Sequence, residues 1–280
     1  MPEIRALKKA YLEITNVCNL RCSFCPGTKR EKRFMSADEF SVLAEKIRPH
    51  TEFLYLHLMG EPLLHPELDR ILAAAGELGF KVIITTNGVL LPSRTQLLVG
   101  SPAVYRVNIS LQSFEANSDK SPDDYIRACT GFAREFSESG RQCIFRLWNK
   151  GGLDSLNGHI KDLLEESFPQ PWTLSRGREI LAERVRLDPG ERFDWPDMSA
   201  EDRGESCFCY GLRDQIGVLC DGTVVPCCLD HDGDIPLGNL FEQELGEILA
   251  SPAAQEIYNG FSQRRAKNEL CRRCGYARRF

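Results

Sequence analysis

The sequence of 280 residues contains no apolar run of about 18 residues, the length that a helix needs to span a bilayer. Its first residues, MPEIRALKKAYLEITNVC, lack the short apolar core of a secretory signal peptide, so we expect none. Neither charge sign dominates, and the net charge of −5 gives no reason to expect a polyanionic partner. Hydrophobic residues make up 42% of the chain, which excludes intrinsic disorder. We therefore expect a folded cytoplasmic protein without a membrane span.

Cysteine is the residue type present in unusual number. The 12 cysteines are about 4% of the chain, below the roughly 8–10% that marks a disulfide-stapled secreted domain. A chain of this length also buries enough apolar surface to fold without disulfide bonds. We therefore expect cysteines in a reducing compartment that act as metal ligands, redox groups or core residues.

Strand and helix patterns alternate along the first 150 residues, which predicts an α/β fold with a parallel sheet. Ser36 and Glu39 form a capping box that opens the first predicted helix. Helices are expected at 36–47, 68–78, 125–139 and 154–168. Strands are expected at 10–15, 53–58, 81–86, 105–112 and 141–148, with a sixth near 180–187.

The predicted strands have one apolar face and one polar face. The lumen of a fully packed barrel is filled by Val, Ile and Leu, and both faces of a parallel sheet are normally covered. We therefore expect an incomplete (β/α)6 TIM-like barrel with a polar cavity at its C-terminal end. An open sheet with a solvated second face is the alternative. The polar faces carry Glu13, Thr15, Tyr55, His57, Thr85, Asn87, Asn108, Ser110, Gln112, Arg146 and Trp148.

A small C-terminal α+β module is expected after the barrel. Asp221-Gly222 separates two strand patterns and is a strong hairpin signal. Two short helical patterns follow at 245–249 and 253–261. The predicted domains are residues 8–200 for the barrel and residues 205–280 for this module.

Cys18, Cys22 and Cys25 form a C-x3-C-x2-C pattern in the loop after the first predicted strand. Three thiolates can hold three corners of a [4Fe–4S] cluster, which usually has four ligands. Because no fourth cysteine lies nearby, one iron stays open to a small molecule. The loop lies at the carboxyl end of a parallel sheet, where such folds bind substrates. A three-cysteine zinc site completed by a distant histidine, or chance clustering, would also give this pattern.

Further motifs join these cysteines, and residues 8–150 together resemble the radical S-adenosylmethionine (SAM) superfamily. Gly60-Glu61-Pro62 matches the family's GGEP motif, in which Met59 here replaces the first glycine, and Thr86-Asn87-Gly88 matches its TNG motif. Phe24 stands where the family places an aromatic residue against adenine. The resemblance implies that SAM is bound by Phe24, Gly60, Glu61, Pro62, Asn87, Ser110, Gln112 and Arg146.

The resemblance also implies the chemistry. SAM would chelate the open iron, and an electron from a donor such as flavodoxin or ferredoxin would release a 5′-deoxyadenosyl radical that takes a hydrogen atom from the substrate. Glu13, Tyr55 and His57 are candidate catalytic residues, and Trp148 is a further candidate substrate contact. The alternative for each is a structural hydrogen bond inside the barrel.

A second set of four thiolates surrounds the predicted hairpin: Cys209, Cys227, Cys271 and Cys274. This arrangement resembles the short form of the SPASM region, called a twitch domain, and implies one auxiliary [4Fe–4S] cluster. The chain would then hold two [4Fe–4S] clusters. A structural zinc ion bound by four cysteines is the alternative, and Cys207 is an alternative to Cys209.

The other cysteines have no ligand role in this reading. Cys129 and Cys143 lie on apolar faces and are expected in the core. Cys207, Cys220 and Cys228 lie around the auxiliary module, where packing, spare ligation or hydrogen-atom donation are open. The segment 264–280 has seven basic residues against one acid, which suits a negatively charged cluster. A solvated tail or a nucleic-acid contact would also explain it.

We therefore expect a radical SAM enzyme of the oxidoreductase or maturase type that dehydrogenates a small molecule or a peptide residue. A maturase that crosslinks or epimerises a ribosomally made peptide is the first alternative, and an RNA-modifying radical SAM enzyme is the second. A zinc-stabilised binding module is the non-enzymatic alternative. Neither a membrane nor a nucleic acid is expected as a partner.

Overall fold

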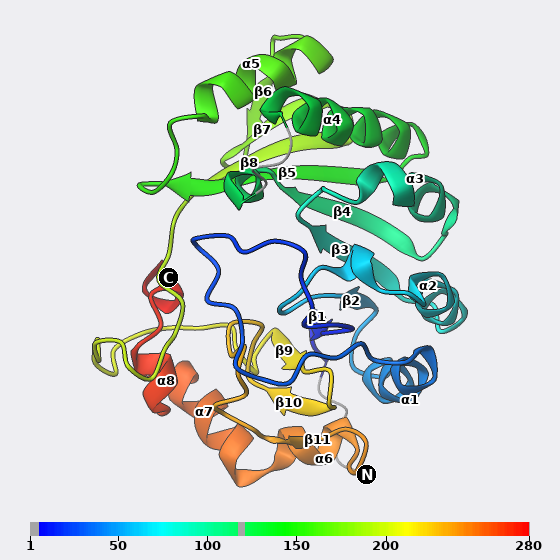
Figure 1. Ribbon diagram of the computed structural model, residues 1–280. Helices are drawn as coiled ribbons and strands as arrows, with labels where there is room; N and C mark the ends of the chain where they lie inside the picture. Colours follow the sequence, from blue (N-terminus) through cyan, green and yellow to red (C-terminus); the bar gives the residue numbers. More distant parts are fainter. Residues whose placement is uncertain (1–5, 117–120, 280) are drawn as a thin grey trace.

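The computed structural model describes residues 6–116 and 121–279 (Figure 1). Strands and helices alternate through its first part, as the sequence predicts. These elements are β1 (Lys9–Leu12), α1 (Ala37–Ile47), β2 (Phe53–Tyr55), η1 (Pro62–Leu64), α2 (Leu68–Glu77), β3 (Lys81–Thr86), α3 (Leu91–Gly100), β4 (Val104–Ser110), η2 (Leu111–Ala116), α4 (Pro122–Glu138) and β5 (Gln142–Lys150).

The remaining elements form a connecting region and a C-terminal module. The connecting region contains α5 (Asn157–Ser167), β6 (Thr173–Ser175), β7 (Arg178–Ala182) and β8 (Val185–Glu191). The module contains β9 (Gln215–Val218), β10 (Thr223–Val225), β11 (Gly238–Asn239), α6 (Leu245–Ala250), α7 (Pro252–Ser262), α8 (Glu269–Arg272) and η3 (Tyr276–Arg279). None of the helices in the two described ranges is long and apolar enough to cross a membrane.

One sheet of 11 strands carries the whole fold, in the order β11-β10-β9-β1-β2-β3-β4-β5-β8-β7-β6. Neighbours from β9 through β8 are parallel, and the strands at both ends are antiparallel. Helices α1 to α4 lie along the outer side of the curved parallel strands (Figure 1). Within the described residues β8 and β9 do not pair, so the barrel is incomplete, as predicted.

The apolar strand faces and the helices make the core. The capping box of α1 is present, because Ser36 accepts from the Glu39 backbone and the Glu39 side chain accepts from Ser36 N. Phe40 and Leu43 of this helix are fully buried against the sheet. Truncation of such a core phenylalanine to alanine costs about 3–5 kcal/mol. The core therefore sets the curvature of the sheet and the positions of its strand ends.

The sixth predicted strand is wrong in its bounds. Residues 180–187 contain the turn of a hairpin, in which β7 and β8 pair antiparallel, and only β8 lies parallel to β5. The turn at Glu183-Arg184 carries no Gly, Pro or Asn to mark it, and both arms alternate in the same way. Helix α3 was not predicted, because it buries only Leu91 and Leu98 and has a weak pattern.

The C-terminal module is joined to the barrel by main-chain hydrogen bonds. Strand β9 pairs in parallel with β1, with Ala10 opposite Ile216, and β10 completes the predicted hairpin. The module therefore extends the barrel sheet rather than adding a separate layer. This pairing sets the cysteines that follow the hairpin beside the end of β1.

Candidate active site

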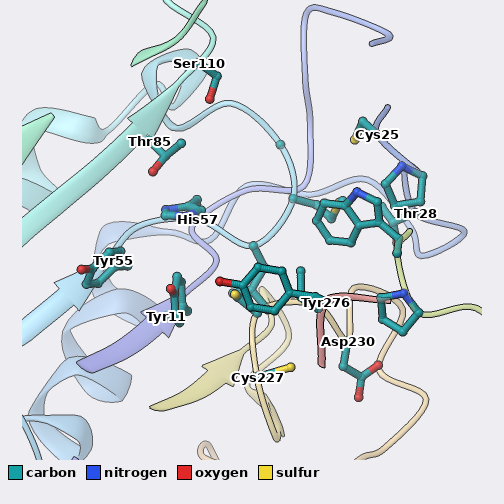
Figure 2. Close-up of a pocket in the computed structure, with 18 of the residues that line it drawn as sticks. Tyr11, Cys25, Thr28, Tyr55, His57, Thr85, Ser110, Cys227, Asp230 and Tyr276 are labelled. Carbon is teal, nitrogen blue, oxygen red and sulfur yellow. The ribbon is translucent and has the colours of Figure 1, made fainter. Parts of the chain in front are cut away.

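A single cavity of about 1370 Å³ follows the inner side of the partial barrel. The side chains that line it come from the barrel strands, the loop after β1 and the C-terminal module (Figure 2). Both sets of predicted ligand cysteines line it: Cys18, Cys22, Cys25, Cys209, Cys227, Cys271 and Cys274. The fold thus brings together two cysteine patterns that lie almost 200 residues apart in sequence.

The loop after β1 places the first three cysteines at the cavity. Cys18 and Cys25 are exposed and Cys22 is half-buried. Cys25 N donates to Cys22 O at 3.1 Å, and the backbone and hydroxyl of Ser23 donate to Glu115 at 2.9 and 2.7 Å. The Glu115 carboxylate therefore fastens the cysteine loop to η2. Phe24 lines the cavity from the same loop.

The Gly60-Glu61-Pro62 turn packs directly against the chain that leads to these cysteines. Gly60 has φ +76°, and a Cβ atom there would lie 2.4 Å from Thr15 O. Only glycine fits this left-handed turn without displacing the backbone. Glu61 N donates to Val17 O at 2.8 Å. Gly60 and Glu61 line the cavity, whereas Pro62 is buried at the start of η1 and is not among the lining residues.

The Glu61 carboxylate joins this turn to the end of β3. It accepts from Leu63 N at 3.0 Å, Thr86 Oγ1 at 2.8 Å and Asn87 N at 2.7 Å. Burial raises the pKa of Glu61 to about 7, and these three donors oppose the rise. Asn87 continues the chain of contacts, since its Nδ2 donates to Asn19 Oδ1 at 2.8 Å and lies 3.9 Å from Cys18 Sγ. The two turns therefore position the loop at Cys18.

The predicted polar faces of β4 and β5 reach the cavity. Ser110, Gln112, Arg146 and Trp148 all line it. Gln112 Oε1 and Arg146 Nε are buried without a hydrogen-bond partner among the described residues. The Arg146 guanidinium lies 4.7 Å from the Trp148 ring centroid. Unpaired buried polar atoms are costly, so these groups fit the wall of a binding site.

Tyr55 and His57 line the cavity together with Tyr11, and Figure 2 shows all three on the side away from Cys25. The Tyr11 ring centroid lies 4.8 Å from that of Tyr55 and 5.3 Å from that of His57. Burial lowers the pKa of His57 to about 3, aided by the charges of Arg146, Lys9 and Arg106. His57 is therefore neutral at physiological pH.

Glu13 has a different position from the one that the sequence suggested. It is fully buried and is not among the lining residues of the cavity. Its carboxylate is paired with Arg30 at 2.8 Å and accepts from Met59 N at 3.1 Å. Because it lies just beyond the end of β1, the polar-face pattern no longer directs it into the lumen. The structure thus places Glu13 in the scaffold behind the site.

The four cysteines of the module lie close enough to interact electrostatically. Burial raises the pKa values of Cys227 and Cys271, and nearby Cys209 and Cys274 raise them further. Gly211 N donates to Cys209 Sγ at 3.3 Å. A cluster that binds thiolates would remove the cost of burying these thiols together.

The remaining cysteines separate into two groups. Cys129 and Cys143 are buried in the core, as predicted. Cys207 is buried and does not line the cavity, whereas Cys228 lines it beside Tyr11. The geometry therefore favours Cys209 over Cys207 as the fourth thiolate of the module. Cys220 is buried, and its Sγ lies 3.1 Å from Glu13 Oε1.

Family models match two parts of this chain. The radical SAM superfamily model matches residues 12–139, and the model of an iron–sulfur cluster-binding domain named SPASM matches residues 207–275. Together these ranges cover well over half of the chain. The chain belongs to the radical SAM superfamily. It is an enzyme of the radical SAM type with a SPASM domain, and its cofactors are SAM and [4Fe–4S] clusters.

Individual relatives agree with this assignment. A GTP 3′,8-cyclase of Synechocystis is 32% identical over 120 residues, which cover 41% of this chain and 36% of that protein. The subtilosin biosynthesis protein AlbA of Bacillus subtilis is 21% identical over 96% of this chain and 65% of its own length. Streptococcus suis SuiB, solved with S-adenosylmethionine, has a TM-score of 0.64 and 20% identity over 96% of this chain and 71% of SuiB. The matches cover between 25% and 65% of the curated relatives' length.

The residues of this radical SAM protein fit its cofactors. Three thiols of one loop and four of the module line the same cavity, and thiolates are the usual ligands of iron–sulfur clusters. Within residues 6–116 and 121–279, no three His, Cys, Asp or Glu side chains are close enough to hold a single metal ion. Gln112 Oε1 and Arg146 Nε, which have no partner among the described residues, can accept and donate hydrogen bonds to the amino-acid part of bound SAM.

Arginines of the basic segment 264–280 form hydrogen bonds and ion pairs within the protein. Arg278 donates to backbone carbonyls of Arg203, Gly204 and Ser206, and Arg272 pairs with Asp202 at 2.9 Å. Further pairs join Arg265 to Glu205 and Arg273 to Glu269. The contacts of Arg265, Arg272 and Arg278 hold residues 202–206 against the module, so a solvated tail does not describe these three residues, whereas Arg279 is exposed.

Several lining residues were not predicted. Arg106 lies two residues upstream of Asn108 and Lys9 four residues upstream of Glu13, so the alternation of the predicted polar faces contains the signal for both. Trp195 and Tyr276 come from segments without a regular pattern. No sequence signal marks these two, because only the packing of residues 191–206 against the module brings them to the cavity.

Proposed function

We propose that this radical SAM enzyme dehydrogenates its substrate, a small molecule or a peptide residue, in a two-electron oxidation. The observation that carries the proposal is the single cavity lined by both cysteine sets. A substrate held there lies between the site of hydrogen removal and a second redox centre. The substrate can then pass its remaining electron to that centre without leaving the cavity.

The residues divide into three groups in this proposal. Cys18, Cys22 and Cys25 hold the first cluster and leave one iron for SAM, while Cys209, Cys227, Cys271 and Cys274 hold the auxiliary cluster. SAM is held by Phe24, Gly60, Glu61, Asn87, Ser110, Gln112 and Arg146, with Pro62 fixing the turn behind Gly60. When SAM is bound and the first cluster is reduced, these two cofactors supply a 5′-deoxyadenosyl radical that removes a hydrogen atom from the substrate.

The chain's own residues supply position and protection from water. Tyr55, His57 and Trp148 border the space beside the SAM site and contact the substrate. Tyr11 and Tyr276 border the same space from β1 and η3 (Figure 2). An aromatic wall excludes water and keeps the target carbon close to the reacting group.

Domains, compartment and electron source follow from the same proposal. Residues 8–200 form the SAM-cleaving barrel and residues 205–280 form the twitch module. The 12 cysteines are all free, which suits a reducing cytoplasm. Flavodoxin or ferredoxin would supply the electron for SAM cleavage.

A peptide maturase is the second candidate. AlbA is a bacteriocin biosynthesis protein, and SuiB is also solved with its precursor peptide SuiA. Both are similar to this chain over almost its full length. A maturase would crosslink or epimerise a residue of a peptide bound in the same cavity.

Mass analysis of the product tests the proposal and separates the two candidates. The reconstituted enzyme is incubated without oxygen with SAM, dithionite and peptides encoded beside its gene, and in parallel with the small molecules of neighbouring pathways. Dehydrogenation or crosslinking gives a product lighter by two hydrogens, and tandem mass spectrometry distinguishes the two. A product isomeric with the substrate would contradict oxidation. The variant Cys271→Ala should still cleave SAM but lose product.

A further inference from the structure

A group of cationic side chains surrounds the aromatic end of the cavity. Lys9, Arg106 and Arg146 all line this cavity together with Tyr11, Tyr55 and His57. Figure 2 shows these two tyrosines and His57 on the side away from Cys25. The cations therefore lie at the end of the substrate space opposite the first cysteine loop. The proposed function assigns no role to Lys9 or Arg106.

The strand register places these side chains at the same height along neighbouring strands of the sheet. The pairing register sets Tyr11 opposite Tyr55, Tyr55 opposite Ile83, and Ile83 opposite Arg106. Arg106 Nη2 donates to the Tyr55 hydroxyl at 2.7 Å. Lys9 Nζ lies 5.1 Å from the ring centroids of both Tyr11 and Tyr55. Strand geometry rather than a loop thus holds both cations.

No acid neutralises these cations. None of Lys9, Arg106 and Arg146 forms an ion pair with an acidic side chain in the described ranges 6–116 and 121–279. Two acids whose backbones adjoin Lys9 and Arg146 are paired with other residues: Asp214 with Lys8 at 2.6 Å and Asp188 with Arg178 at 3.2 Å. Asp188 acts on Arg146 only through space. The three cations at this cavity end therefore have no directly paired acid among the described residues.

Two buried polar atoms at this end have no partner. Arg106 Nε and His57 Nδ1 are shielded from solvent and form no hydrogen bond within the described chain. Burial lowers the pKa of His57 most, and the charges of Arg146, Lys9 and Arg106 lower it further. The imidazole therefore adds no further positive charge. A buried donor of a charged group that has no hydrogen-bond partner loses its hydration without compensation. A ligand with several acceptor oxygens would satisfy these atoms.

We propose that Lys9 and Arg106 bind an anionic group of the substrate, a carboxylate or a phosphate, with Tyr55 and His57 completing the site. This inference rests on the proposed function and adds the substrate class to it. The Lys9 ammonium and the Arg106 guanidinium lie 5.1 and 5.8 Å from the Tyr55 ring centroid, and together they match the oxygens of such a group. Arg146 lies opposite Ser110 in the β4–β5 pairing, and both residues are proposed to contact SAM.

The experiment measures anion binding to the reconstituted holoenzyme saturated with SAM, by anaerobic calorimetry. Inorganic phosphate and succinate are the two probes, and they distinguish a phosphate-bearing from a carboxylate-bearing substrate. The variants are Arg106→Gln and Lys9→Met. The control is Lys81→Met, which removes a positive charge from an exposed pair with Glu52 outside the cavity.

We expect wild type to bind at least one probe, and either cavity variant to weaken that binding by about tenfold or more. Lys81→Met should change it by less than about twofold. SAM affinity should stay unchanged in Arg106→Gln and Lys9→Met. Two variants are used because Arg106→Gln also removes a contact to Tyr55, whereas Lys9→Met leaves that contact intact.

Three results would overturn the inference. They are no binding of either probe by wild type, anion binding by the variants equal to that of wild type, and loss of SAM rather than of the probe by both variants. The last result would assign the cations to the carboxylate of SAM. Formation of 5′-deoxyadenosine without substrate is measured in the same samples. If wild type forms no 5′-deoxyadenosine, the proposed function is wrong, but the result on anion binding still holds.

Discussion

Both carboxylate oxygens of Glu13 lie 2.8 Å from Nη2 of Arg30, in an ion pair that is almost completely buried. The same carboxylate accepts from Met59 N and lies beside the Cys220 thiol. Arg30 in turn donates through Nε to His231 O at 2.9 Å. One pair of side chains thus joins the end of β1, the cysteine loop, the Gly60 turn and the SPASM domain.

Glu13→Gln should destabilise the holoenzyme. Removing one partner of a buried ion pair leaves the other charge uncompensated, and the expected loss is about 3–5 kcal/mol in the free energy of unfolding. Anaerobic urea unfolding measures it. The control Glu52→Gln, which opens an exposed pair with Lys81, should cost less than about 1 kcal/mol. A Glu13→Gln enzyme of unchanged stability that binds SAM but fails to turn over would restore Glu13 as a substrate contact.

Gly60→Ala should abolish SAM binding. The added Cβ would meet Thr15 O at 2.4 Å, so the turn and the chain before Cys18 must separate. Gly140→Ala is the matched control, because Gly140 also has a positive φ, +86°, but has nothing within 4 Å of a Cβ. The control should lose only about 1 kcal/mol of stability and keep SAM affinity. Equal SAM affinity in both variants, measured by equilibrium dialysis, would refute this role of the turn.

Cys209→Ala should remove about four irons per chain from the anaerobically reconstituted protein, since it removes a ligand of the auxiliary cluster. Cys207→Ala should keep its full iron content, because Cys207 is buried away from the cavity. Iron and sulfide analysis with Mössbauer spectroscopy measures both. Iron loss in Cys207→Ala but not in Cys209→Ala would show that Cys207, and not Cys209, is the ligand of the auxiliary cluster.

The stability of the protein should fall as the pH is lowered from 7 to 5.5, partly through His57. Its folded pKa of about 3 is below the unfolded value of 6.5, so the unfolded chain binds more protons between these values. The groups that face it are Arg146, Lys9, Arg106, Tyr11 and Tyr55.

The comparison with His57→Gln isolates this contribution. Between pH 7 and 5.5 wild type should lose about 1 kcal/mol more than the variant in the free energy of unfolding. Anaerobic urea unfolding at both pH values gives the numbers. Parallel losses in the two proteins would show that His57 titrates normally in the folded state.

The sequence predicted those parts of the fold and site that depend on local pattern. The capping box at Ser36, the Asp221-Gly222 hairpin and the end of β3 before Asn87 all follow from a few neighbouring residues, whereas β4 ends at Ser110, two residues before its predicted end. The two cysteine patterns were equally visible. Local spacing was enough because each feature depends on a single turn or strand.

Other features depend on contacts between distant segments. Glu13 was expected to face the lumen, and the alternation of β1 cannot show that the strand ends at Leu12 and that Arg30 captures the next carboxylate. The hairpin of β7 and β8 has no turn residues to reveal it. The hydrogen bonds of Arg278 to the carbonyls of Arg203, Gly204 and Ser206 likewise need the tertiary packing.

The central claim is that the three thiolates of Cys18, Cys22 and Cys25 leave one iron free to bind and cleave SAM. Anaerobically reconstituted enzyme is mixed with SAM and dithionite, and 5′-deoxyadenosine and methionine are measured by chromatography. We expect both products in equal amounts from wild type and neither from Cys22→Ala, while Cys271→Ala still forms them. Failure of fully loaded wild type to form 5′-deoxyadenosine, or its undiminished formation by Cys22→Ala, would contradict the account.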